Sequence, residues 1–305
     1  MIISASRRTD IPAFYSDWFY RRIEEGYVMV RNPMNMHQVS RLSLSPEVID
    51  CIVFWTKNPE KMMPRLHLLD KYMYYYQFTI NPYDKQLERN VPKKAPIIDT
   101  FKRLSEKIGP KRMIWRYDPI IITKHITEEY HFNYFEALAA KLHNYTDKCI
   151  ISFVDFYSKA QGNLKSIGAH EIKEQDKTRI ALRFSEIAKT YSLKLETCAE
   201  DIDLFAYGIE SSKCIDADLI ESLLGVKLKT AKDRNQRELC CCAASVDIGA
   251  YNTCGHGCLY CYASYSRSVV SRNMAEYELA SPLLCSKLTD EDIIKEKNSM
   301  SLRYL

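Results

Sequence analysis

Three cysteines near the carboxyl end of the chain have a spacing suited to an iron–sulfur cluster. Cys254, Cys258 and Cys261 form a C-x3-C-x2-C arrangement in the segment YNTCGHGCLYCYAS. Three thiolates in so short a loop can each bind one iron of a 4Fe–4S cubane, while the fourth iron has no protein ligand. The amine and carboxylate of an amino acid from outside the protein could then chelate that open iron.

The residues around these cysteines suit a tight loop with an aromatic flank. Gly255 and Gly257 allow the backbone to turn closely around an inorganic core. Tyr260 directly precedes the third cysteine, and we expect its ring to offer an aromatic flank for an adenine. Structural zinc is the alternative, because zinc prefers four protein ligands and His256 could supply the fourth.

Five further cysteines could form a second site, and they are Cys198, Cys214, Cys240, Cys241 and Cys242. All except Cys241 could hold an auxiliary 4Fe–4S cluster, with Cys241 pointing away from it. Zinc, a disulfide relay or a buried strand of small residues would also explain them. Seven of the eleven cysteines lie between Cys214 and Cys261, which is the distribution of a site and not of a scattered core.

Short β-branched or aromatic runs alternate with stretches of helical periodicity, which predicts an α/β fold with parallel strands. The helical stretches include residues 97–108 and 180–191. Seven strands, with an eighth at 246–249, indicate a full or partial (β/α) barrel, and a doubly wound sheet is the alternative. The carboxyl-terminal tail is expected to be helical. The seven strand candidates are residues 2–5, 27–31, 51–55, 73–80, 112–117, 149–154 and 193–198.

Polar and charged side chains lie at the ends of these strands, where parallel α/β folds form their functional face. The cations among them predict an anionic ligand, and Lys57 and Arg116 are expected to contact the cofactor. Arg116 differs from the other cations because it lies inside its strand. The pairs Asn58-Pro59, Asn81-Pro82 and Asp118-Pro119 could be ordinary turn residues without a function. The residues expected to bind the substrate are Arg7, Arg8, Asp118, Asp155 and Glu200.

The composition argues against a membrane protein and gives little support for a nucleic-acid-binding protein. The 43 basic residues are nearly balanced by 39 acidic ones. The chain has no apolar run of about 18 or more residues, and its first residues lack the order of a secretion signal. We therefore expect a cytoplasmic protein, whose cysteines serve metal binding or catalysis.

The chain is expected to have two parts. Residues 1–239 are expected to form the barrel body, and residues 240–305 the cluster loop that completes the barrel plus the helical tail.

The stretch CGHGCLYCYA resembles the cluster loop of radical S-adenosylmethionine enzymes, especially the branch around spore photoproduct lyase. RRTDIP, FWTKNP, FTIN and WRYDPII resemble that branch more loosely, and the whole chain resembles the family called domain of unknown function 1848. The resemblance implies that a reduced cluster passes one electron to S-adenosylmethionine. The resulting 5′-deoxyadenosyl radical would take a hydrogen atom from a small-molecule or nucleotide-like anionic substrate. A donor of the flavodoxin or ferredoxin type would supply the electron.

The position of the cysteine loop departs from the pattern of those enzymes. Their cysteine loop follows the first barrel strand, whereas here it follows the last predicted one, near residue 250. A circularly permuted barrel would explain this order, because barrel strands close on themselves. The usual glycine-glycine-glutamate strand is not visible, so Thr79 and Asn81 are the candidates for contacts to the methionyl amine or the ribose.

Two other classes of function compete with this prediction. A non-enzymatic module could use zinc or an iron–sulfur cluster to stabilise a contact with nucleic acid or protein. A barrel hydrolase could arrange Asp118, Asp155 and Glu200 around a divalent metal, but it leaves the cysteines unexplained. The nature of the bound metal and the release of 5′-deoxyadenosine separate these possibilities.

Overall fold

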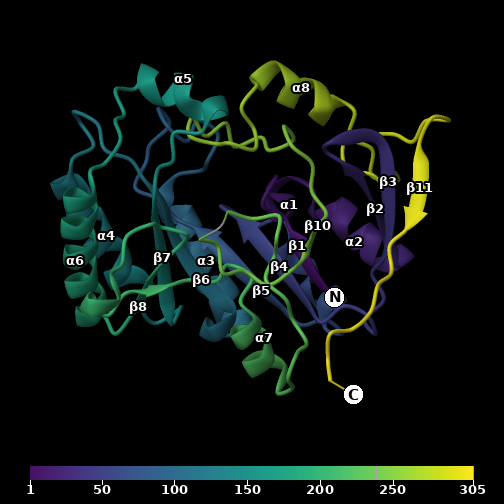
Figure 1. Ribbon diagram of the computed structural model, residues 1–305, viewed down its shortest axis with the longest axis horizontal. Helices are drawn as coiled ribbons and strands as arrows, with labels where there is room; N and C mark the ends of the chain where they lie inside the picture. The colour runs from purple at the N-terminus through teal and green to yellow at the C-terminus, as the bar shows by residue number, and fades with distance from the viewer. Residues whose placement is uncertain (238, 305) are drawn as a thin grey trace.

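A computed structural model describes residues 1–237 and 239–304 and contains an eight-stranded sheet in which every neighbouring pair is parallel (Figure 1). In the described residues the two outermost strands, β10 and β9, are not paired with each other, so the sheet is open. The α/β fold with parallel strands is thus confirmed, and the open sheet is consistent with a partial barrel. In spatial order the strands are β10 (Val246–Asp247), β1 (Ile2–Ala5), β4 (Cys51–Thr56), β5 (Tyr74–Thr79), β6 (Met113–Ile120), β7 (Lys148–Phe153), β8 (Lys194–Thr197) and β9 (Glu210–Ser211).

One predicted barrel strand belongs to a second sheet. Residues 27–31 lie in β2 (Tyr27–Asn32), which pairs antiparallel with β3 (Asn35–Ser43), and β11 (Ile293–Glu296) pairs parallel with β3. The prediction was wrong because only two residues separate β2 from β3, and so short a connection makes a hairpin and not a parallel crossover. The tail contains one helix, α8 (Arg267–Ala275), and then β11, so it is only partly helical.

Helices cover the outer face of the large sheet and bury its aromatic side chains. Both helical predictions are confirmed, as α3 (Lys94–Ile108) and α6 (Glu174–Thr190). Phe135 of α4 (Glu128–Leu142) stacks on Phe184 of α6, with ring centroids 4.0 Å apart, and on Trp115 of β6 at 5.1 Å. The remaining elements of the body are α1 (Ile11–Phe14), α2 (Ser16–Glu25), α5 (Ser158–Ser166) and three 3₁₀ segments (Met63–Leu69, Pro110–Arg112 and Phe205–Tyr207).

The inner face of the open sheet is covered by residues 212–237 and 239–243, which we call the plug. The plug contains α7 (Ala217–Leu224), whose first turn is capped by the Asp216 carboxylate. Ile215 and Ile220 of the plug pack against Tyr75 and Ile150 of the sheet in one buried cluster. In Figure 1 the plug lies in front of the central strands. It therefore occupies the space that a closed barrel would enclose.

In the described part of the chain, no helix is both long and apolar enough to cross a bilayer.

Candidate metal centre

The loop with the three cysteines begins at β10, and Asp247 anchors that short strand. The Asp247 carboxylate accepts hydrogen bonds from Ser4 Oγ at 2.9 Å, from Ser6 Oγ at 2.6 Å and from the Arg7 amide at 2.8 Å. These bonds fix the carboxyl end of β10 beside that of β1. The following loop crosses the upper end of the sheet in Figure 1, near α5, where Tyr262 packs against Tyr157. The loop thus lies where parallel folds place their functional groups.

A short segment after β5 holds the loop in place. Glu88 and Cys258 form an antiparallel bridge, and the Leu259 amide donates to the Leu87 carbonyl at 2.9 Å. Gly257 has a φ of +65°, and a Cβ on Gly255 would lie 2.9 Å from the Phe14 ring. The glycines of the CGHGC stretch are therefore required by a left-handed backbone at one position and a close contact at the other.

The three thiols of the loop are partly shielded and prefer to stay protonated without a positive partner. Burial is the main cause that raises the pKa of Cys254, Cys258 and Cys261, and it raises the pKa of Cys258 to about 12. The neighbouring thiols contribute to the shift at Cys254. Thiolates in such surroundings need a cation, and a bound metal supplies one. The donor set therefore fits a metal cluster.

The geometry does not match a site for a single ion. Among the residues that the structure describes, no three His, Cys, Asp or Glu side chains come together as ligands of one metal ion. A structural zinc site requires such convergence, because all four ligands bind the same ion. In a cubane each thiolate binds a different iron, so its sulfur atoms lie farther apart.

His256 is paired with a carboxylate. Its Nε2 lies 2.8 Å from Asp10 Oδ2, both side chains are buried, and His256 Nδ1 has no hydrogen-bond partner. Asp10 also accepts bonds from the Ala13 amide at 2.9 Å and the Lys57 amide at 2.7 Å. A carboxylate on one ring nitrogen is the usual support of a metal-binding histidine.

Glu88 is the centre of a buried charge network beside the loop, which we call the Glu88 network. Its carboxylate binds Lys57 Nζ at 2.8 Å and Lys94 Nζ at 2.6 Å, and it accepts the Tyr260 hydroxyl at 2.5 Å. Burial opposes ionisation, but the two lysines outweigh it and hold the pKa of Glu88 at about 2. Sequence reasoning missed Glu88, because it lies in an irregular segment and belongs to no recognisable motif.

The predicted cofactor contacts lie around this network. Tyr260 and Asn81 are joined by a 3.2 Å hydrogen bond, and Asn81 also bonds both backbone groups of Asp118, at 2.7 and 2.8 Å. The Tyr260 hydroxyl is therefore occupied by protein groups, and its ring packs against Tyr83 with centroids 5.8 Å apart. Thr79 lies at the carboxyl end of β5, in register with Arg116 of β6. Its contact with a cofactor stays a prediction.

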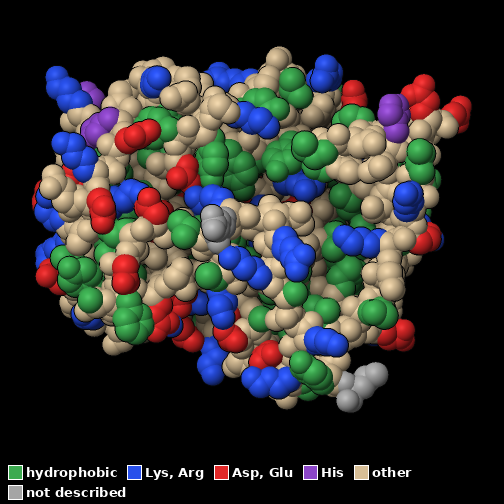
Figure 2. Space-filling view, in the orientation of Figure 1, with side chains coloured by type: hydrophobic (Ala, Val, Ile, Leu, Met, Phe, Trp, Pro, Cys, Tyr) green, Lys and Arg blue, Asp and Glu red, His purple; other side chains and the backbone are tan. Residues whose placement is uncertain are grey.

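The four cations predicted to bind an anion are paired to different degrees. Lys57 is neutralised by Glu88, and Arg116 binds the Asp118 carboxylate at 2.5 and 3.0 Å. Arg7 and Arg8 form longer ion pairs, at 3.8 Å to Asp233 and 4.0 Å to Asp247, and Arg8 Nη1 also donates to the Gly249 carbonyl at 3.4 Å. These two arginines line a groove of about 450 Å³ together with Lys295 and Lys297. Figure 2 shows several basic side chains near the middle of this face.

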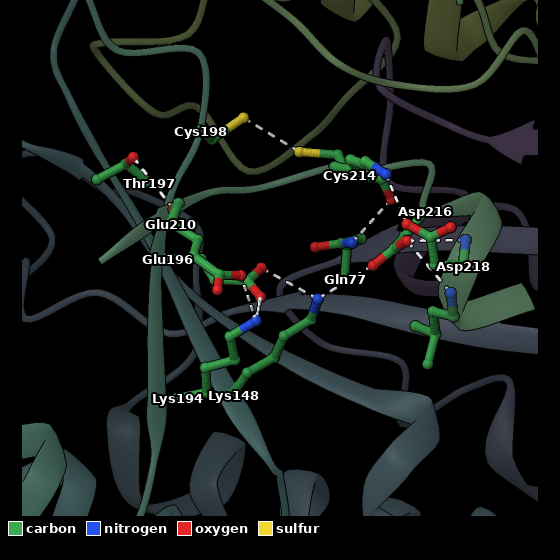
Figure 3. Close-up of polar contacts among 12 residues, drawn as sticks. Gln77, Lys148, Lys194, Glu196, Thr197, Cys198, Glu210, Cys214, Asp216 and Asp218 are labelled. Atoms are coloured by element: carbon green, nitrogen blue, oxygen red, sulfur yellow. Dashed lines mark hydrogen bonds and ion pairs between the residues drawn. The ribbon is translucent and has the colours of Figure 1, made fainter. Parts of the chain in front are cut away.

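Four cysteines of the second group lie together where the end of β8 meets the plug, and they are Cys198, Cys214, Cys240 and Cys242. Cys198 and Cys214 have their Sγ atoms 3.1 Å apart, and their side chains point toward one another (Figure 3). A hydrogen bond with Cys242 lowers the pKa of Cys240 to about 7. The Ile215 amide donates to Cys242 Sγ at 3.4 Å. Cys241 is exposed.

The three carboxylates of the hydrolase alternative have separate partners. Asp118 binds Arg116 and Ser152, and Asp155 binds Arg237 at 2.5 Å near the surface. Glu200 accepts the Phe153 amide at 2.8 Å and lies 3.3 Å from Lys177, and burial raises the pKa of Glu200. Across residues 1–237 and 239–304, these groups do not assemble as a metal site.

Comparison with known proteins identifies a family. A solved structure from Bacteroides thetaiotaomicron, described as a candidate alpha-L-fucosidase, is 12% identical over 58% of this chain and 72% of that chain, with a TM-score of 0.25. A likeness of this size carries no argument. No curated protein matches the chain. The family model described as domain of unknown function 1848 matches residues 2–263, from β1 through the cysteine loop. The chain therefore belongs to the domain of unknown function 1848 family.

Proposed function

We propose that the protein is a radical S-adenosylmethionine enzyme whose cluster is held by Cys254, Cys258 and Cys261. The observation that carries this proposal is the position of three partly shielded thiols in one short loop at the carboxyl ends of β10 and β1. When bound and reduced, a 4Fe–4S cluster with one open iron supplies the electron that cleaves S-adenosylmethionine to methionine and a 5′-deoxyadenosyl radical.

The residues of the chain would position the reactants and keep water away. The Glu88 network would fix the cysteine loop, because Glu88 binds both lysines and also the Tyr260 hydroxyl. Arg7 and Arg8, the least tightly paired of the four cations, would attract an anionic substrate into the groove they line. The plug and the outer helices close the sheet on both faces, which leaves the strand ends as the open side.

The strand order supports a permuted relationship to other radical enzymes. β10 is late in the sequence, yet it lies at the edge of the sheet beside β1. The cysteine loop therefore follows an edge strand in space, as it would if the chain of an ordinary enzyme had been cut after its first strand and rejoined at its ends.

The test is anaerobic reconstitution of the full chain with iron and sulfide, followed by chemical reduction with S-adenosylmethionine. We expect about four irons in the loop site and release of 5′-deoxyadenosine. Cys258→Ala should lose this iron and the release together. Cys241→Ser removes an exposed thiol and is the matched control, which should keep both. Well-loaded, reduced protein that releases no 5′-deoxyadenosine would refute the proposal.

A second candidate is a non-enzymatic metal module, favoured by the free Nδ1 of His256 and its pairing with Asp10. This module predicts stoichiometric zinc and no colour after aerobic purification. His256→Gln separates the two functions, because it should release zinc from a four-ligand site but leave the iron of a three-cysteine cluster in place.

A further inference from the structure

The strand register brings Cys198 and Cys214 side by side. β8 and β9 pair in parallel, with Thr197 opposite Ser211, and the Ser212 amide continues the pairing to the Thr197 carbonyl at 2.6 Å. Cys198 therefore leaves the sheet next to the point where the chain enters the plug and reaches Cys214. Their sulfur atoms are 3.1 Å apart, which is closer than ordinary packing of two thiols requires.

The surroundings of Cys214 hold it rigidly and place a cation against its sulfur. Its carbonyl accepts the Tyr75 hydroxyl at 2.7 Å and the Gln77 side-chain amide at 2.9 Å. Its sulfur accepts a hydrogen bond from Arg116 Nη1 at 2.8 Å. A buried guanidinium at that distance stabilises a negative sulfur over a neutral one. Cys198 is the more exposed of the two thiols, so an oxidant from solvent reaches it first.

We propose that Cys198 and Cys214 form a reversible disulfide, so that the protein carries a redox-active thiol pair apart from the cysteine loop. The Cys198 thiolate attacks one sulfur of a low-molecular-weight disulfide, which releases one thiolate and leaves a mixed disulfide. The Cys214 thiolate then attacks Cys198 Sγ and expels the second thiol. Two electrons pass to the oxidant, and the two thiol protons end on the released thiols.

The short contact between Cys198 and Cys214 favours this chemistry over a second metal centre. Cys242 is hydrogen-bonded to both Cys214 and Cys240, but among the described residues no three His, Cys, Asp or Glu side chains meet as ligands of one ion. The separation of 3.1 Å is also much shorter than that between thiolates on different irons of a cubane. Oxidation would tie the end of β8 to the plug and close residues 199–213 into a loop.

The experiment equilibrates the full chain anaerobically in buffers of oxidised and reduced glutathione. Free thiols are then alkylated and mapped by mass spectrometry of non-reduced peptides. We expect Cys198 and Cys214 to lose alkylation together and to appear in one cross-linked peptide, which a dithiol reductant releases. In Cys198→Ser, Cys214 should stay alkylated, whereas Cys241→Ser should leave the pair unchanged.

Two further measurements keep the inference separate from the proposed radical chemistry. Cys258→Ala should form the same cross-link, because Cys258 lies in the cysteine loop and takes no part in the Cys198–Cys214 pair. Arg116→Gln should slow cross-linking about tenfold or more, the equivalent of one hydrogen bond to a charged group. If both cysteines remain alkylated in the most oxidising buffer, or if a bound metal protects them, the pair is not redox-active.

Discussion

Replacing Glu88 with glutamine should be among the most destabilising single changes near the cysteine loop. Glu88→Gln keeps the shape of the side chain but leaves Lys57 and Lys94 without their negative partner. The pKa of Glu88 falls from an ordinary 4.5 to about 2, which corresponds to about 3 kcal/mol of folding stability. Because Glu88 is 1% exposed, solvent screens little of this. We expect a loss of about 3 kcal/mol, the lower end for a broken buried ion pair.

The direction of the pKa shift of Glu88 determines how the stability loss in Glu88→Gln changes with pH. A carboxylate whose pKa is depressed in the folded state stabilises the protein fully above its unfolded pKa and loses that effect as pH falls through its folded pKa. The difference between the native protein and Glu88→Gln should therefore be largest above about pH 4.5 and shrink toward about pH 2.

The measurement is urea unfolding, followed by circular dichroism, from neutral to acidic pH. Glu186→Gln is the control, because that exposed carboxylate pairs with Arg183 on the surface of α6 and should cost less than about 1 kcal/mol. Adding Lys57→Met to Glu88→Gln should recover part of the loss. A loss below about 1 kcal/mol, or one independent of pH, would refute the electrostatic account of this network.

Three other predictions concern the core and the loop. Phe184→Ala should cost about 3–5 kcal/mol, because it removes a fully buried ring stacked on Phe135; thermal unfolding measures this. Gly257→Ala should reduce iron loading of the loop, since its φ of +65° strains any other residue by about 1 kcal/mol; iron analysis against Gly162→Ala, a helical glycine with free space around it, checks this. Asp247→Asn should weaken the β10 anchor and raise hydrogen exchange at the Arg7 amide, whereas unchanged protection would show that the carboxylate charge is unimportant.

The sequence predicted β1, β4, β5, β6 and β7 of the large sheet well because each is a compact apolar run whose residues are mostly buried. It assigned residues 27–31 to the wrong sheet, because alternation along a strand does not tell which sheet the strand joins. The two-residue connection at Pro33 and Met34 indicates a hairpin and could have shown this. β9 was missed because it has only two residues, and β11 because its two isoleucines are followed at once by a lysine and a glutamate and form no longer apolar run.

The cysteine groups were visible in the sequence, because thiol spacing in a short loop is local information. The partners of the charged residues in the folded protein were not visible in the sequence. Lys57 and Arg116 were expected to face an anionic ligand, but Glu88 and Asp118 bind them in the folded protein. Glu88 lies 31 residues from Lys57 in the chain, so only the tertiary structure brings the pair together.

The two edges of the large sheet have a consequence for self-association. β9 and β10 are each two residues long, so each edge presents few unpaired amide and carbonyl groups to a strand from another molecule. Long exposed edges are the usual starting points of sheet extension between chains. The large sheet can therefore stay open without presenting a long edge to which a strand of another molecule could add.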